Sequence, residues 1–70
     1  MATIQVTYKT ITTRIYNVEE GEIANSRNTD YRFQDLEGYG RHGYVLVSTV
    51  TAPTHDGTLI IDTLALTEEY

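Results

Sequence analysis

The opening stretch of the chain alternates apolar and polar residues as a β-strand does. β-Branched and aromatic residues dominate positions 3–18, and they fit a pleated surface better than a helix, where they lose side-chain freedom. The apolar positions change parity midway, from Ile4, Val6 and Tyr8 to Ile11 and Ile15. Because such a change needs an extra residue or a turn, we expect one long strand over residues 3–18 with a bulge near Thr10. Two strands joined by a tight hairpin are the alternative.

A polar segment separates this strand from the next apolar pattern. Residues 19–28 begin with three glutamates around a glycine, namely Glu19, Glu20 and Glu22. We expect a surface loop of about ten residues here, long enough to bind a partner. The plainer interpretation is that the three acids are simply solvated. The loop would end at Asn28 or Thr29, since either side chain can cap a following helix.

A short helix is predicted next. Its apolar side chains repeat at a helical spacing that would face a sheet, and they are Phe33, Leu36 and Tyr39. Gly38 and Gly40 favour an early end, because glycine is a poor helix former. We therefore expect a helix over residues 30–39.

Two further strands complete the pattern. Gly43 supplies the freedom for a turn with positive φ at the end of the helix. Residues 44–51 begin with apolar side chains on both parities, which is typical of a strand covered on both faces. An Asp-Gly pair within residues 53–58 indicates a hairpin loop. We expect the return strand over residues 59–66, followed by a polar tail.

This order predicts a single α+β domain over residues 1–70, with a three-stranded antiparallel-type sheet and one short helix on one face. A helix of about ten residues cannot cover both faces of such a sheet. The uncovered face would expose part of the first strand and several of the residues Val45, Val47, Ile60, Leu64 and Leu66. Because a monomer with such a patch tends to associate, we predict a homo-oligomer, a dimer or higher, with these residues at its interface.

Composition narrows the class of partner. The 70 residues include no cysteine, so disulfides and thiolate metal sites cannot support this small domain. Ten acids against five bases give a formal charge of −5, which disfavours direct nucleic-acid binding. The sequence shows no basic-then-apolar leader and no run of about 18 apolar residues. We therefore expect a cytoplasmic protein with no membrane partner.

Residues 36–48 resemble the motif of one protein family. The stretch Leu36-Glu-Gly-Tyr-Gly-Arg-His-Gly-Tyr44-Val-Leu-Val-Ser48 is similar to a Leu-x-x-x-Gly-x-x-Gly-aromatic-x-Leu-Val-Ser pattern. That pattern belongs to short bacterial proteins known as a domain of unknown function. Tyr44 stands where tryptophan is usual, and the loop before the helix is longer. The resemblance implies a β-α-β-β fold and no activity. The chain is also similar to small acidic products of phage genes, which would make it a phage accessory protein.

Three sequence features could indicate a catalytic or ligand-binding site, and each is better explained by the structure or the surface of the domain. Three glycines in residues 38–43 match G-x-G-x-x-G, but a dinucleotide site requires that loop to open a helix, and here it would close one. His42 and His55 supply too few ligands for a zinc site. The paired carboxylates fall where acids normally solvate a surface. We therefore expect no enzyme activity, no metal and no cofactor.

An aromatic and basic cluster at the glycine-rich turn is the remaining candidate site, formed by Tyr39, Arg41, His42 and Tyr44. An exposed arginine beside aromatic rings can hold a nucleobase or a carboxylate, although tyrosines in such a turn also serve as packing. We expect a non-enzymatic binding module that engages a protein surface or a small anionic ligand, nucleotides included, near a subunit junction. The alternative is an acidic inhibitor that uses the glutamates of residues 19–22 to compete for a partner's nucleic-acid-binding site.

Overall fold

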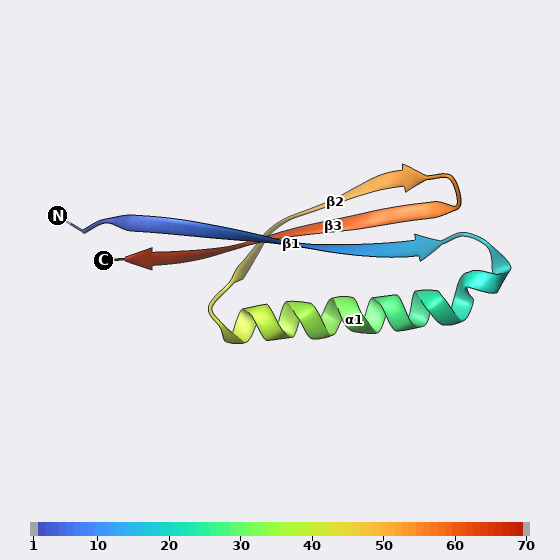
Figure 1. The fold of residues 1–70 in the computed structure, drawn as a ribbon, viewed down its shortest axis with the longest axis horizontal. Helices are drawn as coiled ribbons and strands as arrows, with labels where there is room; N and C mark the ends of the chain where they lie inside the picture. The colour runs from blue at the N-terminus through green and yellow to red at the C-terminus, as the bar shows by residue number, and fades with distance from the viewer. Residues whose placement is uncertain (1, 70) are drawn as a thin grey trace.

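The computed structural model describes residues 2–69, which form three strands and one long helix (Figure 1). The elements follow the order β1 (Ile4–Tyr16), the short 3-10 helix η1 (Glu19–Gly21), α1 (Glu22–Arg41), β2 (Val45–Thr54) and β3 (Gly57–Glu69). All strand pairs are antiparallel. The predicted α+β class, with its β-α-β-β order and three-stranded sheet, is confirmed.

β3 is the central strand of the sheet, whose order is β1-β3-β2. β1 pairs with β3 along its whole length, from Ile4 opposite Glu69 to Tyr16 opposite Gly57. β2 is shorter, because it begins only where Val45 pairs with Ala65. Residues 4–7 and 66–69 therefore continue beyond β2 as a two-stranded extension, which we call the ribbon. The prediction that the return strand ends at residue 66 was wrong, because β1 supplies a ladder for residues 67–69; Tyr70 lies outside the described residues.

The expected bulge near Thr10 is absent, since the register of β1 with β3 runs without interruption. Paired residues share a face of the sheet, and successive residues alternate between faces. Odd-numbered residues of β1 therefore lie on the same face as Asp62, which α1 contacts, and we call this the helix face. Even-numbered residues lie on the opposite, helix-free face. The change of parity thus reflects apolar side chains on both faces of one regular strand, and the irregularity of the sheet is in β2, between Leu46 and Ser48.

α1 is twice as long as predicted, with 20 residues. Residues 19–28 are not a loop, because they form η1 and the first turns of α1, and neither Asn28 nor Thr29 is a cap. The helix also continues through Gly38 and Gly40. It ends where Gly43 adopts a φ of 91°, as predicted for the turn into β2. Of the predicted sheet-facing residues, Leu36 and Tyr39 are half-buried, whereas Phe33 is exposed.

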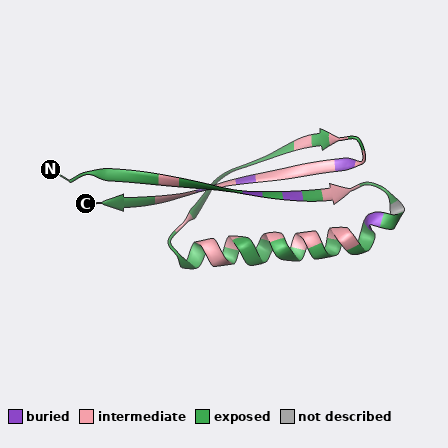
Figure 2. Cartoon of the chain, in the orientation of Figure 1, coloured by how far each residue is buried: buried purple, intermediate pink, exposed green. Residues whose placement is uncertain are grey.

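Little of the chain is buried (Figure 2). Among residues 2–69, the buried large apolar side chains are Ile11 and Leu64. The backbone measures 56 × 21 × 10 Å, with a radius of gyration of 15.1 Å. A compact domain of this length would have a radius of gyration of about 11 Å. The folded chain is thus thin and extended, with a small core. Within the described residues, no helix has the length and apolar character needed to cross a membrane.

Candidate functional site

A buried ion pair joins three elements on the helix face. The Asp62 side chain, in the middle of β3, is 0% exposed. Arg32 of α1 donates from Nε to its Oδ2 at 2.7 Å and from Nη2 to its Oδ1 at 3.0 Å. Thr49 of β2 donates from Oγ1 to the same Oδ1 at 2.7 Å. These bonds leave no buried side-chain polar atom unsatisfied among residues 2–69.

The hydrogen bonds from Arg32 hold the pKa of Asp62 below its usual range, although burial of the carboxyl acts in the opposite direction, and the bond from Thr49 lowers it further. The same contact raises the pKa of Arg32. Asp62 is therefore a carboxylate at neutral pH with its charge already compensated. Its role is to hold α1 and β2 against β3, and it is not available to a ligand.

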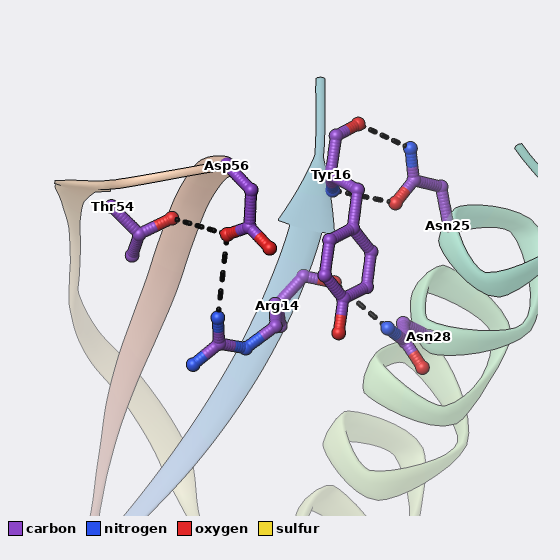
Figure 3. Close-up of polar contacts among 6 residues, drawn as sticks. All are labelled: Arg14, Tyr16, Asn25, Asn28, Thr54 and Asp56. Atoms are coloured by element: carbon purple, nitrogen blue, oxygen red, sulfur yellow. Dashed lines mark hydrogen bonds and ion pairs between the residues drawn. The ribbon is translucent and has the colours of Figure 1, made fainter. Parts of the chain in front are cut away.

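The outer edge of β1 is closed at one end by asparagine side chains from α1 (Figure 3). Asn25 accepts from the Tyr16 backbone N–H through Oδ1 and donates from Nδ2 to the Tyr16 carbonyl, both at 2.7 Å. Asn28 donates from Nδ2 to the Arg14 carbonyl at 2.8 Å. Asn25 therefore makes the two bonds that a residue of a neighbouring strand would make. The sheet-facing side of α1 is largely polar for this reason, and no described residue of the helix is buried.

A second polar group lies at the same end of β1, on the helix-free face (Figure 3). The guanidinium of Arg14 lies 3.6 Å from Asp56 Oδ1 and 5.9 Å from the centre of the Tyr16 ring. Thr54 donates from Oγ1 to the same Asp56 oxygen at 3.3 Å. Because Arg14 and Asp56 are both well exposed, this pair contributes little stability. It does neutralise Arg14, which is then a poor anion site.

A hollow of about 230 Å³ lies between α1 and β1. Its polar lining includes Asn28, Tyr31, Arg32 and Asp35. Arg32 is already bound to Asp62, and Asp35 adds a negative charge. The hollow therefore does not favour the small anionic ligand that the sequence led us to expect.

The predicted cluster at the end of α1 is brought together only in part. The rings of Tyr39 and Tyr44 meet edge to face, with centres 5.3 Å apart and planes at 67°. The Tyr44 backbone N–H also donates to the Tyr39 carbonyl at 3.0 Å. The Arg41 side chain is 78% exposed and lies 3.6 Å from the Glu37 carboxylate, while His42 is exposed. The two tyrosines thus pack the turn, and the acid beside Arg41 disfavours anion binding.

The predicted acidic residues do not form a loop. Glu20 lies in η1 and Glu22 begins α1, and both are exposed. The side chain of Glu19 lies outside the described part of the structure. The two histidines, His42 and His55, flank opposite ends of β2. In the described range 2–69, no three residues of the types His, Cys, Asp and Glu gather as metal ligands.

The predicted interface residues divide between the two faces of the sheet. Val45 is 64% exposed and lies on the helix-free face, because it pairs with Ala65. Val47 is also exposed. Ile60, Leu64 and Leu66 lie on the helix face. Leu64 is 2% exposed, so its assignment to an exposed interface was wrong, since it forms part of the core of the single chain. Ile60 and Leu66 are half-buried.

The sequence predicted an uncovered apolar face, but Ile60, Leu64 and Leu66, which it assigned there, lie on the helix face, and the apolar helix-free face is formed largely by other residues. Eight of the apolar residues that the strand register places on the helix-free face are Ile4, Val6, Tyr8, Val45, Val50, Leu59, Ile61 and Ala65. We call this set the helix-free apolar face. Ile4 and Tyr8 are 66% and 63% exposed. The even-numbered apolar positions of the first strand were the available signal. For the buried pair, the signal was a lone aspartate within an apolar strand.

Comparison of the chain with protein-family models, with curated proteins and with solved structures finds no match. The similarity to a bacterial family therefore stays a prediction.

Proposed function

We propose that this protein is a non-enzymatic, homo-oligomeric module that binds protein surfaces through its helix-free apolar face. The observation that supports the proposal is the contrast between core and surface. The subunit buries the large apolar side chains of Ile11 and Leu64, while five of the eight residues of the helix-free apolar face are exposed: Ile4, Val6, Tyr8, Val45 and Val50.

The magnitude of this imbalance favours association. Burying one Val, Leu or Ile side chain contributes about 1.5–3 kcal/mol. A folded domain is stable by only about 5–15 kcal/mol in total. Covering even some of the five exposed side chains would therefore add free energy comparable with the whole stability of the subunit. An apolar patch of this extent on a small subunit marks an interaction surface.

A protein partner agrees better with the charges than a small anion does. Arg14, Arg32 and Arg41 each lie beside a carboxylate within the subunit. An anionic ligand bound at any of these three arginines would have to displace the neighbouring acid. The helix-free apolar face requires no such exchange, because an apolar protein surface binds it by excluding water.

Sedimentation or light scattering over a wide range of protein concentration tests the proposal. The wild-type protein should have a mass above that of one chain. Tyr8→Lys places a charge on the helix-free apolar face and should weaken association by at least tenfold. Thr51→Lys, an exposed site on the helix face of β2, is the matched control and should leave the mass unchanged. A wild-type monomer at high micromolar concentration, or equal behaviour of the two variants, would refute the proposal.

A further inference from the structure

The ribbon is the least supported part of the sheet. It comprises residues 4–7 and 66–69, which pair with each other and with no third strand. Figure 1 shows the two ends of the chain projecting together beyond α1 and β2. An isolated two-stranded hairpin or ribbon is only marginally stable in water. A third strand on either edge would make the ribbon three-stranded, as the rest of the sheet is.

The first half of the outer edge of β1 can pair with such a third strand. Backbone N–H and C=O groups of an antiparallel strand point alternately toward one neighbour and the other. The bonds that Asn25 and Asn28 make to Tyr16 and Arg14 show that the backbone N–H and C=O groups of even-numbered β1 residues point away from β3. The unbroken register extends this outward direction to residues 4, 6, 8 and 10. α1, which bonds this edge at residues 14 and 16, does so at the other end of β1, and β2 lies on the far side of β3.

We propose that a second copy of this chain completes the ribbon by antiparallel pairing of the two β1 edges over residues 4–10, centred on Thr7. This inference rests on the proposed function and names the junction at which two copies meet. In this register Val6 of each copy lies opposite Tyr8 of the other. Pairs of an aromatic and a β-branched residue, and Thr–Thr pairs, are among the stabilising cross-strand neighbours in sheets.

The charges favour the β1 edge over the other edge of the ribbon. Pairing two β3 edges would bring together Glu68 and Glu69 of both copies, and like charges on adjacent strands are destabilising. Residues 4–10 of β1 carry a single charge, that of Lys9. In the proposed register Lys9 lies opposite Gln5 of the other copy, and Gln5 itself pairs with Glu68. The only lysine of an acidic chain would thus lie near the other copy's acids.

The remaining free edge, that of β2, carries features that prevent pairing. Its backbone is interrupted by the irregularity between Leu46 and Ser48, and it contains Pro53 near its end. Prolines and bulges are typical of edges that proteins protect from association. Residues 4–10 of β1 have neither. The asparagines of α1 also stop the pairing at residue 12, so two copies form a closed, two-fold pair.

This junction would join two three-stranded sheets into one continuous sheet. The helix-free apolar faces of both copies would then be continuous, with Ile4, Val6 and Tyr8 of each copy at the centre. The binding surface of the proposed function would therefore double in width at the subunit junction.

Val6→Pro tests the junction, with mass measured by light scattering as a function of concentration. Proline removes the outward N–H of residue 6 and leaves the ladder between β1 and β3 intact. We expect Val6→Pro to lower the association constant at least tenfold. Val6→Thr, which retains the N–H, and Thr51→Pro, which removes an outward N–H from β2, should associate as the wild type does. Association of Val6→Pro at wild-type strength would overturn the β1 junction and leave the proposed function standing, whereas a monomeric wild type would remove both.

Thr7→Cys provides a second measurement that does not depend on tolerance of proline. Facing residues of a non-hydrogen-bonded antiparallel pair have Cα atoms about 4.5 Å apart, within the range of a disulfide. Because the chain has no cysteine, oxidation of this variant should yield a covalent dimer in high yield. Thr51→Cys should not cross-link under the same conditions. An associated protein in which the two variants cross-link equally would overturn the proposed register.

Discussion

The two halves of β1 differ in what surrounds them. The second half, residues 11–16, lies beside α1, and its outward backbone groups at Arg14 and Tyr16 bond to asparagine side chains. Ile11 and Thr13 are buried there. The first half carries the same number of apolar side chains, yet these three, Ile4, Val6 and Tyr8, are all exposed and its outward edge is open. The comparison shows that burial along this strand depends on the position of α1, and that the chain completes only one half of its own sheet.

The largest effect is expected in the covered half, at Asp62. Asp62→Ala leaves Arg32 partly buried without its carboxylate, and breaking a buried ion pair costs about 3–5 kcal/mol. Chemical denaturation should show this loss. Asp56→Ala removes the exposed partner of Arg14 and should cost no more than about 1 kcal/mol. Equal effects of the two substitutions would contradict the structural role of the buried pair.

A smaller effect is expected where α1 closes the edge of β1. Asn25→Ala removes both hydrogen bonds to the Tyr16 backbone and leaves partly buried polar groups unpaired, at a cost of about 1–3 kcal/mol. Asn17→Ala, at an exposed position outside the strand, should be close to neutral. A neutral Asn25→Ala would show that the asparagine does not hold the helix to the strand.

Two glycines at the C-terminal end of α1 should respond to alanine substitution with effects of opposite sign. Gly38→Ala should stabilise the protein by about 0.5–1 kcal/mol, because alanine is a better helix former and an added Cβ would meet nothing within 4 Å. Gly43→Ala should destabilise it by about 1–2 kcal/mol, because its φ is 91° and an added Cβ would lie 3.1 Å from Leu66. Thermal unfolding measures both. Destabilisation by Gly38→Ala would indicate a shorter helix.

The smallest effect is expected from mild acid. The pKa of Asp62 is lowered by its bonds to Arg32, so the pair stabilises the folded state fully above the unfolded pKa of an aspartate, about 3.9. That contribution should be lost only as the pH falls below this value, toward the folded pKa of Asp62. Denaturation of wild type and Asp62→Ala at successive pH values should show their difference in stability shrinking in acid. A difference that grows as the pH falls would contradict the assignment.

The sequence predicted the order of elements and the class of sheet, because β-branched alternation and glycine-rich turns identify strands without reference to tertiary contacts. It did not predict the first turns of α1. Asn25 and Asn28 face the sheet there, and polar side chains leave no apolar periodicity to detect. The sequence also showed that the apolar positions of β1 change from even-numbered to odd-numbered residues, but the bulge expected from this change was wrong. The cause is that α1 covers one face of the second half of β1 and leaves the opposite face of the strand open, and this arrangement is visible only in the three-dimensional structure.

Hydrogen exchange at the backbone amides of residues 6–9 tests most directly whether the ribbon is completed by another chain. Thr7 and Lys9 bond to β3 and serve as internal controls, whereas the amides of Val6 and Tyr8 point away from it. In concentrated solution we predict that Val6 and Tyr8 exchange as slowly as Thr7 and Lys9. On dilution Val6 and Tyr8 should lose their protection, while Lys9, which lies where the sheet has three strands, should keep it. Exchange of Val6 and Tyr8 at the rate of an unstructured peptide, at every concentration, would contradict this account.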